Sequence, residues 1–138
     1  MKHFIKPLSI LLFTICASLQ AEVAIIVNPS NNSQISESEI QRIFLGKITN
    51  FPDGELAVPI NQTEQAPATD EFNTDVLKKS SSQLKVYWSK VLFTGQGTPP
   101  KVVTSDEEVV KLVSTNPNLI GYIDSSMVTS GVKVIAKF

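Results

Sequence analysis

Histidine and cysteine are nearly absent from this sequence. The 138 residues include one His, at position 3, and one Cys, at position 16. Both lie in an apolar N-terminal segment that we expect to be removed, which would leave a mature protein without imidazole or thiol groups. Ser-His-Asp and Cys-His catalysis, thiolate zinc sites and structural disulfides are therefore excluded from the mature chain.

The N-terminal segment has the organisation of a secretory signal peptide. Lys2 and Lys6 form a basic end, an apolar run covers residues 7–17, and Ala21 is a small residue before the polar Glu22. The run is too short to span about 30 Å of hydrocarbon as a mature helix, so an uncleaved membrane anchor is the less favoured alternative. We predict cleavage after Ala21, which gives a signal peptide at residues 1–21 and a periplasmic domain at residues 22–138.

Neither sign of charge dominates the composition. The chain has 12 Lys and Arg against 13 Asp and Glu, and loss of Lys2 and Lys6 would bring the net charge to near −3. Lys47, Lys85 and Lys90 are expected to be isolated charges rather than a basic patch. This balance, with 42% hydrophobic residues, excludes a nucleic-acid-binding protein and a disordered chain. The length suits one domain.

Strand and helix patterns alternate along residues 22–138. Apolar runs rich in β-branched residues predict strands at residues 22–28, 56–61, 101–104, 119–123 and 132–137. Pro59 predicts that the second strand lies near a sheet edge or is irregular. The order favours one α/β domain, with a mostly parallel or mixed sheet and helices on both faces.

The expected helices begin at recognisable start signals. Pro67 suits the first turn of one helix. Three further helices follow capping boxes, in which a serine and a residue three positions later exchange hydrogen bonds; the pairs are Ser36/Glu39, Ser80/Gln83 and Ser105/Glu108. Leu84, Trp88, Val91 and Leu92 share one face of the helix after Ser80. Residues 124–128 could add one further turn.

No catalytic constellation accompanies these elements. The acidic groups, Asp70 with Glu71 and Asp106 with its two neighbours, fall in first turns of expected helices, where carboxylates favour the helix dipole. Arg42, the single arginine, is expected on a helix surface. The sequence has no Gly-x-Ser-x-Gly or Ser-x-x-Lys motif, and nothing in it predicts a metal or a cofactor. We therefore expect a binding protein rather than an enzyme.

The order of elements itself favours a small anion as ligand. Several expected helices start directly after strands, so their free N–H groups would point towards one end of the sheet. Open α/β sheets bind ligands at the carboxyl ends of strands, and helix N-termini there suit anions.

Several motifs resemble the substrate-binding proteins of phosphate ABC importers. Residues 44–50 (FLGKITN) resemble that family's IFxGK(I/L)xxW stretch, with Phe51 where the family usually has Trp. Residues 58–61 (VPIN), 84–100 (LKVYWSKVLFTGQGTPP) and 116–122 (NPNLIGY) add to the likeness, which covers about residues 23–137. The resemblance implies a type II periplasmic binding protein fold, in which two α/β lobes close on phosphate. This chain looks like a compact relative that keeps mainly one lobe.

The phosphate loop departs from the family pattern. The family has an Arg-x-Asp/Glu-Gly-Ser-Gly-Thr sequence where this chain has residues 61–69 (NQTEQAPAT). An amide replaces the arginine, Ala66 the serine and Pro67 a glycine, whereas Glu64 keeps the acid that would accept the phosphate proton. Loss of the arginine removes charge-assisted hydrogen bonds of about 1.5–3 kcal/mol each. The ligand-binding residues that the resemblance still implies are Asn61, Thr63 and Thr69.

Two functions remain open. The first is an exported solute-binding protein for phosphate or another small oxyanion, with an ABC permease as its partner or with a second copy that completes the cleft as a homodimer. The alternative is a periplasmic adaptor or sensor module that has lost ligand capture and binds another protein.

Overall fold

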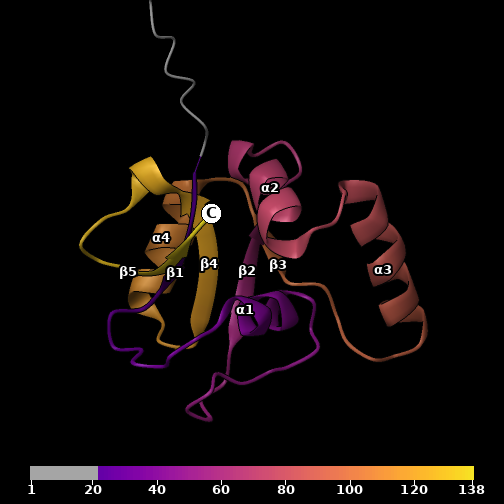
Figure 1. Ribbon diagram of the computed structural model, residues 1–138, viewed down its shortest axis with the longest axis horizontal. Coiled ribbons are helices and arrows are strands. Elements are labelled where there is room, and N and C mark those ends of the chain that lie inside the picture. The colour runs from indigo at the N-terminus through magenta and orange to yellow at the C-terminus, as the bar shows by residue number, and fades with distance from the viewer. Residues whose placement is uncertain (1–21) are drawn as a thin grey trace, which may run out of the picture.

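The computed structural model describes residues 22–138, which form a five-stranded sheet flanked by helices (Figure 1). The predicted signal peptide, with His3 and Cys16, lies outside the described residues. The strands are β1 (Val23–Val27), β2 (Val58–Gln62), β3 (Lys101–Val103), β4 (Leu119–Asp124) and β5 (Lys133–Lys137), and their order across the sheet is β3-β2-β4-β1-β5.

Strand β1 runs against the direction of the other four. It is antiparallel to both β4 and β5, whereas β2 is parallel to β3 and to β4. Alternate residues of β1 enter two hydrophobic clusters, Val23 and Ile25 on one face and Ala24 and Ile26 on the other. Burial on both faces explains why β1 is apolar throughout, and the mixed α/β sheet predicted from the sequence is confirmed.

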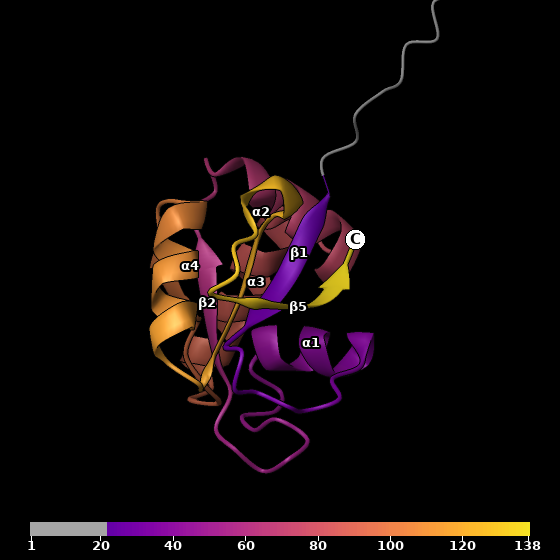
Figure 2. The ribbon, with the colours of Figure 1, turned by 90° about the vertical axis from the view of Figure 1, so that its left-hand side faces the viewer.

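Helices cover both faces of the sheet, as predicted. On one face lie α1 (Glu37–Phe44), α2 (Pro67–Glu71) and the π-helical turn η1 (Phe72–Leu77), which continues α2. On the other face lies α4 (Asp106–Thr115), as Figure 2 shows. Helix α3 (Ser81–Phe93) lies at the margin of the molecule, and the short 3-10 turn η2 (Ser125–Met127) precedes β5 (Figure 1). No helix within residues 22–138 is both long enough and apolar enough to cross a bilayer.

Close packing of α4 on β4 depends on Gly121. A Cβ atom at this position would lie 2.5 Å from the Cγ1 atom of Val109, which is fully buried with Val113 in the predicted apolar face of α4. The close approach places Asp106, the first residue of α4, beside Gln62 at the end of β2.

The serine caps form as predicted, but only one of the three capping boxes is complete. The N-cap serines all accept a backbone N–H: Ser36, Ser80 and Ser105. The Gln83 side chain returns a bond to the Ser80 N–H at 2.9 Å. In contrast, the Glu108 carboxylate accepts from the Thr104 N–H at 2.9 Å, one residue before its expected partner. The Oε2 atom of Glu39 is buried with no hydrogen-bond partner among the described residues.

Pro59 lies near an edge of the sheet, in the strand next to the edge strand β3. Strand β2 lies between β3 and β4. The Val58 N–H donates to the Asn118 carbonyl on the β4 side at 2.8 Å, so backbone alternation turns the Pro59 nitrogen towards the β3 side. Because β3 pairs only from Ile60 onwards, no strand requires an N–H from Pro59 there.

Candidate functional site

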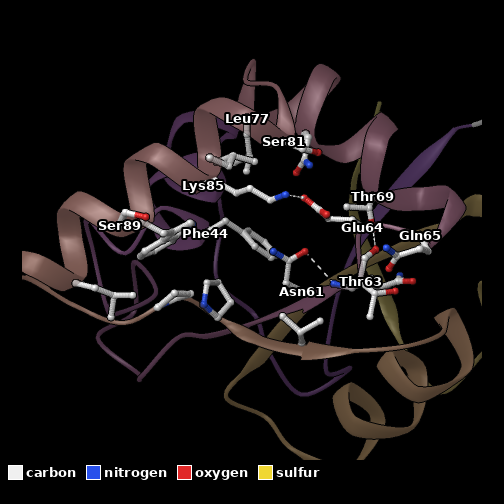
Figure 3. Close-up of a pocket in the computed structure, with 18 residues that line it drawn as sticks. Phe44, Asn61, Thr63, Glu64, Gln65, Thr69, Leu77, Ser81, Lys85 and Ser89 are labelled. Atoms are coloured by element: carbon white, nitrogen blue, oxygen red, sulfur yellow. Dashed lines mark hydrogen bonds and ion pairs between the residues drawn. The ribbon is translucent and has the colours of Figure 1, made fainter.

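A cavity of about 650 Å³ lies between α3 and the carboxyl end of β2. Polar side chains from residues 61–65, at the end of β2 and the loop that follows, form one end of it (Figure 3). The remainder is mostly apolar, with walls that include Phe44, Leu77, Leu84, Trp88, Leu92 and Val102. The carboxyl end of a parallel strand is where open α/β sheets bind ligands, so this cavity is the candidate site.

All three sequence-predicted binding residues line this cavity, and Asn61 lies at its polar end. The Oδ1 atom of Asn61 accepts hydrogen bonds from the Tyr122 hydroxyl and from the Gln62 N–H, the latter at 2.8 Å. These bonds fix the amide and leave its Nδ2 donors without a partner among the described residues. The Thr63 hydroxyl likewise makes no hydrogen bond within residues 22–138, and both groups can therefore donate to a bound solute.

Thr69 differs from the other two because its hydroxyl is already used. It is only 3% exposed, and its Oγ1 donates to the Thr63 carbonyl at 2.7 Å. This bond ties the start of α2 to the end of β2. Thr69 therefore holds the Thr63 backbone in place, and its hydroxyl proton is not available to a ligand.

Tyr122 supports the polar end from beneath. Its ring is fully buried and stacks on Phe72 with centroids 3.8 Å apart, and its hydroxyl accepts the Gln62 N–H at 3.1 Å while donating to Asn61. Burial raises the pKa of the Tyr122 hydroxyl, which keeps it a neutral donor. The sequence showed Tyr122 only as the end of a strand motif, because its role depends on pairing with residues about 60 positions away.

The amide that stands in place of the family's arginine does not face the cavity as a free donor. Gln62 is 3% exposed, and its Nε2 donates to the Asp106 carboxylate and to the Tyr122 carbonyl, both at 2.8 Å. Its hydrogen bonds therefore join β2 to α4 and β4 rather than serving a ligand.

The cavity carries one pair of opposite charges. Lys85 of α3 reaches the Glu64 carboxylate across the polar end at 3.2 Å, with the two side chains 71% and 48% exposed (Figure 3). This pairing is compatible with the expectation that Lys85 belongs to no basic patch. It could not be predicted, because the sequence does not reveal how α3 is oriented. An exposed pair of this kind contributes about 0–1 kcal/mol to stability, so either partner can turn to a ligand at little cost.

The acidic groups expected at helix starts lie outside the cavity. Glu71 and Asp75, one helical turn apart, share a hydrogen bond that raises the pKa of Glu71, and burial and repulsion from nearby carboxylates act in the same direction. Hydrogen bonds from Thr104 lower the pKa of Glu108. Within the described residues, no cluster of acidic, histidine or cysteine side chains is arranged to hold a metal ion.

One buried amide in the cavity wall is not satisfied. Asn73 of η1 is 5% exposed, and its Oδ1 atom has no hydrogen-bond partner within the described part of the chain. A buried acceptor without a partner is costly. No sequence signal indicated this residue, because its position depends on the π-helical turn.

No protein-family model and no curated protein matches the chain. Solved structures do match. A phosphate ABC transporter substrate-binding protein from Clostridium perfringens, solved with bound phosphate, superposes with a TM-score of 0.63 at 22% identity, over 83% of this chain and 45% of its own. An ABC-type phosphate transport receptor from Vibrio cholerae gives 0.63 at 19% identity, over 83% and 46%. PstS from Borrelia burgdorferi gives 0.59 at 18% identity, over 84% and 47%.

The chain thus spans less than half the length of these proteins, which are transport binding proteins rather than enzymes. Sequence identities of this size support a shared fold, but they do not identify a ligand. The described residues have the fold of one part of a phosphate ABC transporter substrate-binding protein, which confirms at the level of the fold the family resemblance seen in the sequence.

Proposed function

We propose that the chain is an exported solute-binding protein without catalytic activity. Residues 1–21 serve as its signal peptide, and the mature protein works in the periplasm. Its ligand carries an oxyanion, with phosphate as the first candidate, and binds at the polar end of the cavity. The observation that supports this most is the position of that polar end, at the carboxyl terminus of β2, in a lobe that superposes on a receptor solved with bound phosphate.

The donors for the oxyanion come from both sides of the cavity. Asn61 Nδ2 and the Thr63 hydroxyl approach from β2, and the Lys85 ammonium approaches from α3. Glu64 can accept the proton of a protonated oxyanion once Lys85 has turned to the ligand. The pair together carries no net charge, and the arginine of the family pattern is missing. Binding weaker than in a receptor with that arginine is therefore expected.

Calorimetric titration with phosphate and with sulfate tests this proposal. Binding should raise the melting temperature in proportion to RT ln(1 + [L]/Kd). Thr63→Val and Lys85→Met should each weaken binding several-fold. Lys90→Met is the matched control, because Lys90 is exposed on the same helix and does not line the cavity. Absence of any heat or thermal shift with millimolar oxyanion-bearing probes, organic ones included, would contradict the proposal.

A protein partner is the second candidate, favoured by the outer face of α3. Phe93 is 93% exposed and Val86 is 71% exposed on this helix. The partner would be a second copy, an ABC permease or another periplasmic protein, as for an adaptor or sensor module. Sedimentation of the purified protein tests whether the partner is a second copy of the chain. A dimer that Phe93→Ser converts to a monomer would support this, whereas a monomer at all concentrations would contradict it.

A further inference from the structure

The cavity is larger and more apolar than an inorganic oxyanion requires. Its volume of about 650 Å³ lies within the 300–1,000 Å³ that is typical of sites for organic ligands. The polar groups occupy one end only. The rest of the wall is built from aromatic and aliphatic side chains of α1, η1, α3 and β3. An inorganic ion at Asn61 and Thr63 would leave this apolar wall in contact with water.

The aromatic part of the wall is held in place before any ligand arrives. The Tyr87 hydroxyl donates to the Leu45 carbonyl at 2.6 Å, which ties α3 to the end of α1. The Trp88 ring packs against Gly46, where an added Cβ would lie 3.3 Å from the indole Cη2 atom. A preformed apolar surface beside fixed polar groups favours a ligand with both characters, because little ordering is needed on binding.

Asn73 gives a second, independent indication of a ligand. It lies in the wall of the cavity, more than nine-tenths buried, with an unpartnered carboxamide oxygen. Rotation of the amide can present either its oxygen or its nitrogen to the cavity. A polar atom on the body of a ligand would satisfy a group that the protein itself leaves unsatisfied.

We infer that the ligand is an organic oxyanion, in which a phosphate, phosphonate or carboxylate head is joined to an aromatic or aliphatic body. The inference rests on the proposed function, since the head binds at Asn61, Thr63 and Lys85 as described above. The body lies along Leu84, Trp88 and Leu92. Lys85 supplies the charge that complements the head. Glu64 accepts hydrogen bonds from polar atoms of the ligand, whereas the Asn73 amide can accept or donate them.

Three probes separate the parts of this inference: inorganic phosphate as the head, benzyl alcohol as the body, and phenyl phosphate as both. Trp88 is the single tryptophan of the chain and lines the cavity, so its fluorescence reports binding alongside calorimetry. Phenyl phosphate should bind about tenfold or more tightly than inorganic phosphate, as expected for burial of an aromatic ring. It should also bind more tightly than benzyl alcohol.

Other outcomes overturn specific claims. Equal affinities for phenyl phosphate and inorganic phosphate would show that the organic body is not recognised. That result would contradict this inference but not the proposed function. Equal affinities for phenyl phosphate and benzyl alcohol would show that the head is not recognised, which contradicts both. Binding of none of the three probes would also contradict both.

Two pairs of exposed variants locate the ligand without disturbing the core. Leu92→Ser should weaken binding of phenyl phosphate several-fold and leave binding of inorganic phosphate unchanged. Leu56→Ser, at a leucine of similar exposure outside the cavity, should change neither. Lys85→Met should weaken the binding of both phenyl phosphate and inorganic phosphate, whereas Lys90→Met should weaken the binding of neither. Equal effects of Leu92→Ser and Leu56→Ser on the binding of phenyl phosphate would place its body outside the cavity and overturn the inference.

Discussion

Tyr122 is the single side chain on which the polar end of the cavity most depends. Its ring packs against Phe72, and its hydroxyl connects the Gln62 N–H to the Asn61 amide. Tyr122→Phe keeps the ring but removes the hydroxyl, so that the Asn61 amide oxygen and the Gln62 N–H keep only the hydrogen bond between them. We expect the free energy of unfolding to fall by about 1–3 kcal/mol. Oxyanion binding should weaken as well, because the Asn61 amide loses one of the two hydrogen bonds that hold it.

Urea denaturation measures this loss, and Tyr87→Phe is the control. Tyr87 gives one hydrogen bond, to the Leu45 carbonyl, from a half-buried position. We expect its replacement to cost less than that of Tyr122. An equal or larger loss for Tyr87→Phe would contradict the central position given to Tyr122.

Asn73 is expected to lower the stability of the free protein. Its buried Oδ1 atom has no partner among the described residues. Replacement by an apolar side chain of similar size removes that cost, so Asn73→Leu should raise the free energy of unfolding by about 1 kcal/mol. Thermal unfolding without ligand tests this. A lower melting temperature for Asn73→Leu would show that the amide is satisfied in solution and would remove its part in ligand binding.

Glu71 makes the stability depend on pH. The hydrogen bond to Asp75, together with burial and repulsion, raises the pKa of Glu71 in the folded state. The folded protein therefore binds this proton more tightly than the unfolded chain does. Its stabilising effect is present at low pH and is lost as the pH rises through the folded pKa.

Glu71→Gln removes this dependence, because the amide stays neutral. We expect the variant to melt at a higher temperature than the natural protein at pH 7. The difference should shrink below about pH 4, where an unperturbed glutamate takes up its proton. Glu55→Gln, in an exposed loop, is the control. A variant that is less stable than the natural protein at pH 7 would contradict the assignment.

Among helices and strands, the contact of α4 with β4 is the least tolerant of added volume. A methyl group on Gly121 would overlap the side chain of Val109. We expect Gly121→Ala to lower the free energy of unfolding by about 1–3 kcal/mol, the usual range for overpacking a core. Gly97→Ala is the control, since a Cβ there meets only Val91 at an ordinary 3.6 Å. Equal melting temperatures for the two variants would contradict this close packing.

The elements could be predicted because their signals are local. β-branched runs, serine caps and Pro67 lie within a few residues of the element that they define, and each expected strand and helix is present. Pro59 predicted a strand that lies near an edge or is irregular, but the exact pairing around it depends on the length of β3, a neighbour about 40 residues away in the chain. The continuation of α2 into a π-helical turn has no comparably simple sequence signal.

The candidate site was only partly predictable for the same reason. Asn61 lies in β2, and Thr63 and Thr69 follow within a few residues, so a family likeness in a short segment could suggest all three. The Glu64–Lys85 pair and the apolar wall depend on where α3 lies relative to β2. Sequence patterns predict the apolar face of α3, but they do not predict the cavity beside that face.

The chain as a whole corresponds to less than half of the receptors on which it superposes. The proposed site on this part has fewer charged groups than the family pattern provides. The apolar wall offers an alternative source of affinity, because burial of a ligand's body does not require a cation. We therefore expect the affinity for the ligand to come from both ends of the cavity.

An amide NMR titration with phenyl phosphate tests the central claim most directly, because it shows where a solute binds. The account predicts saturable shifts at Thr63, Glu64 and Gln65 and at the Trp88 indole N–H, with none at Ser30 and Asn31 in a separate pocket. Saturable shifts centred on Ser30 and Asn31, or no shifts at millimolar ligand, would contradict it.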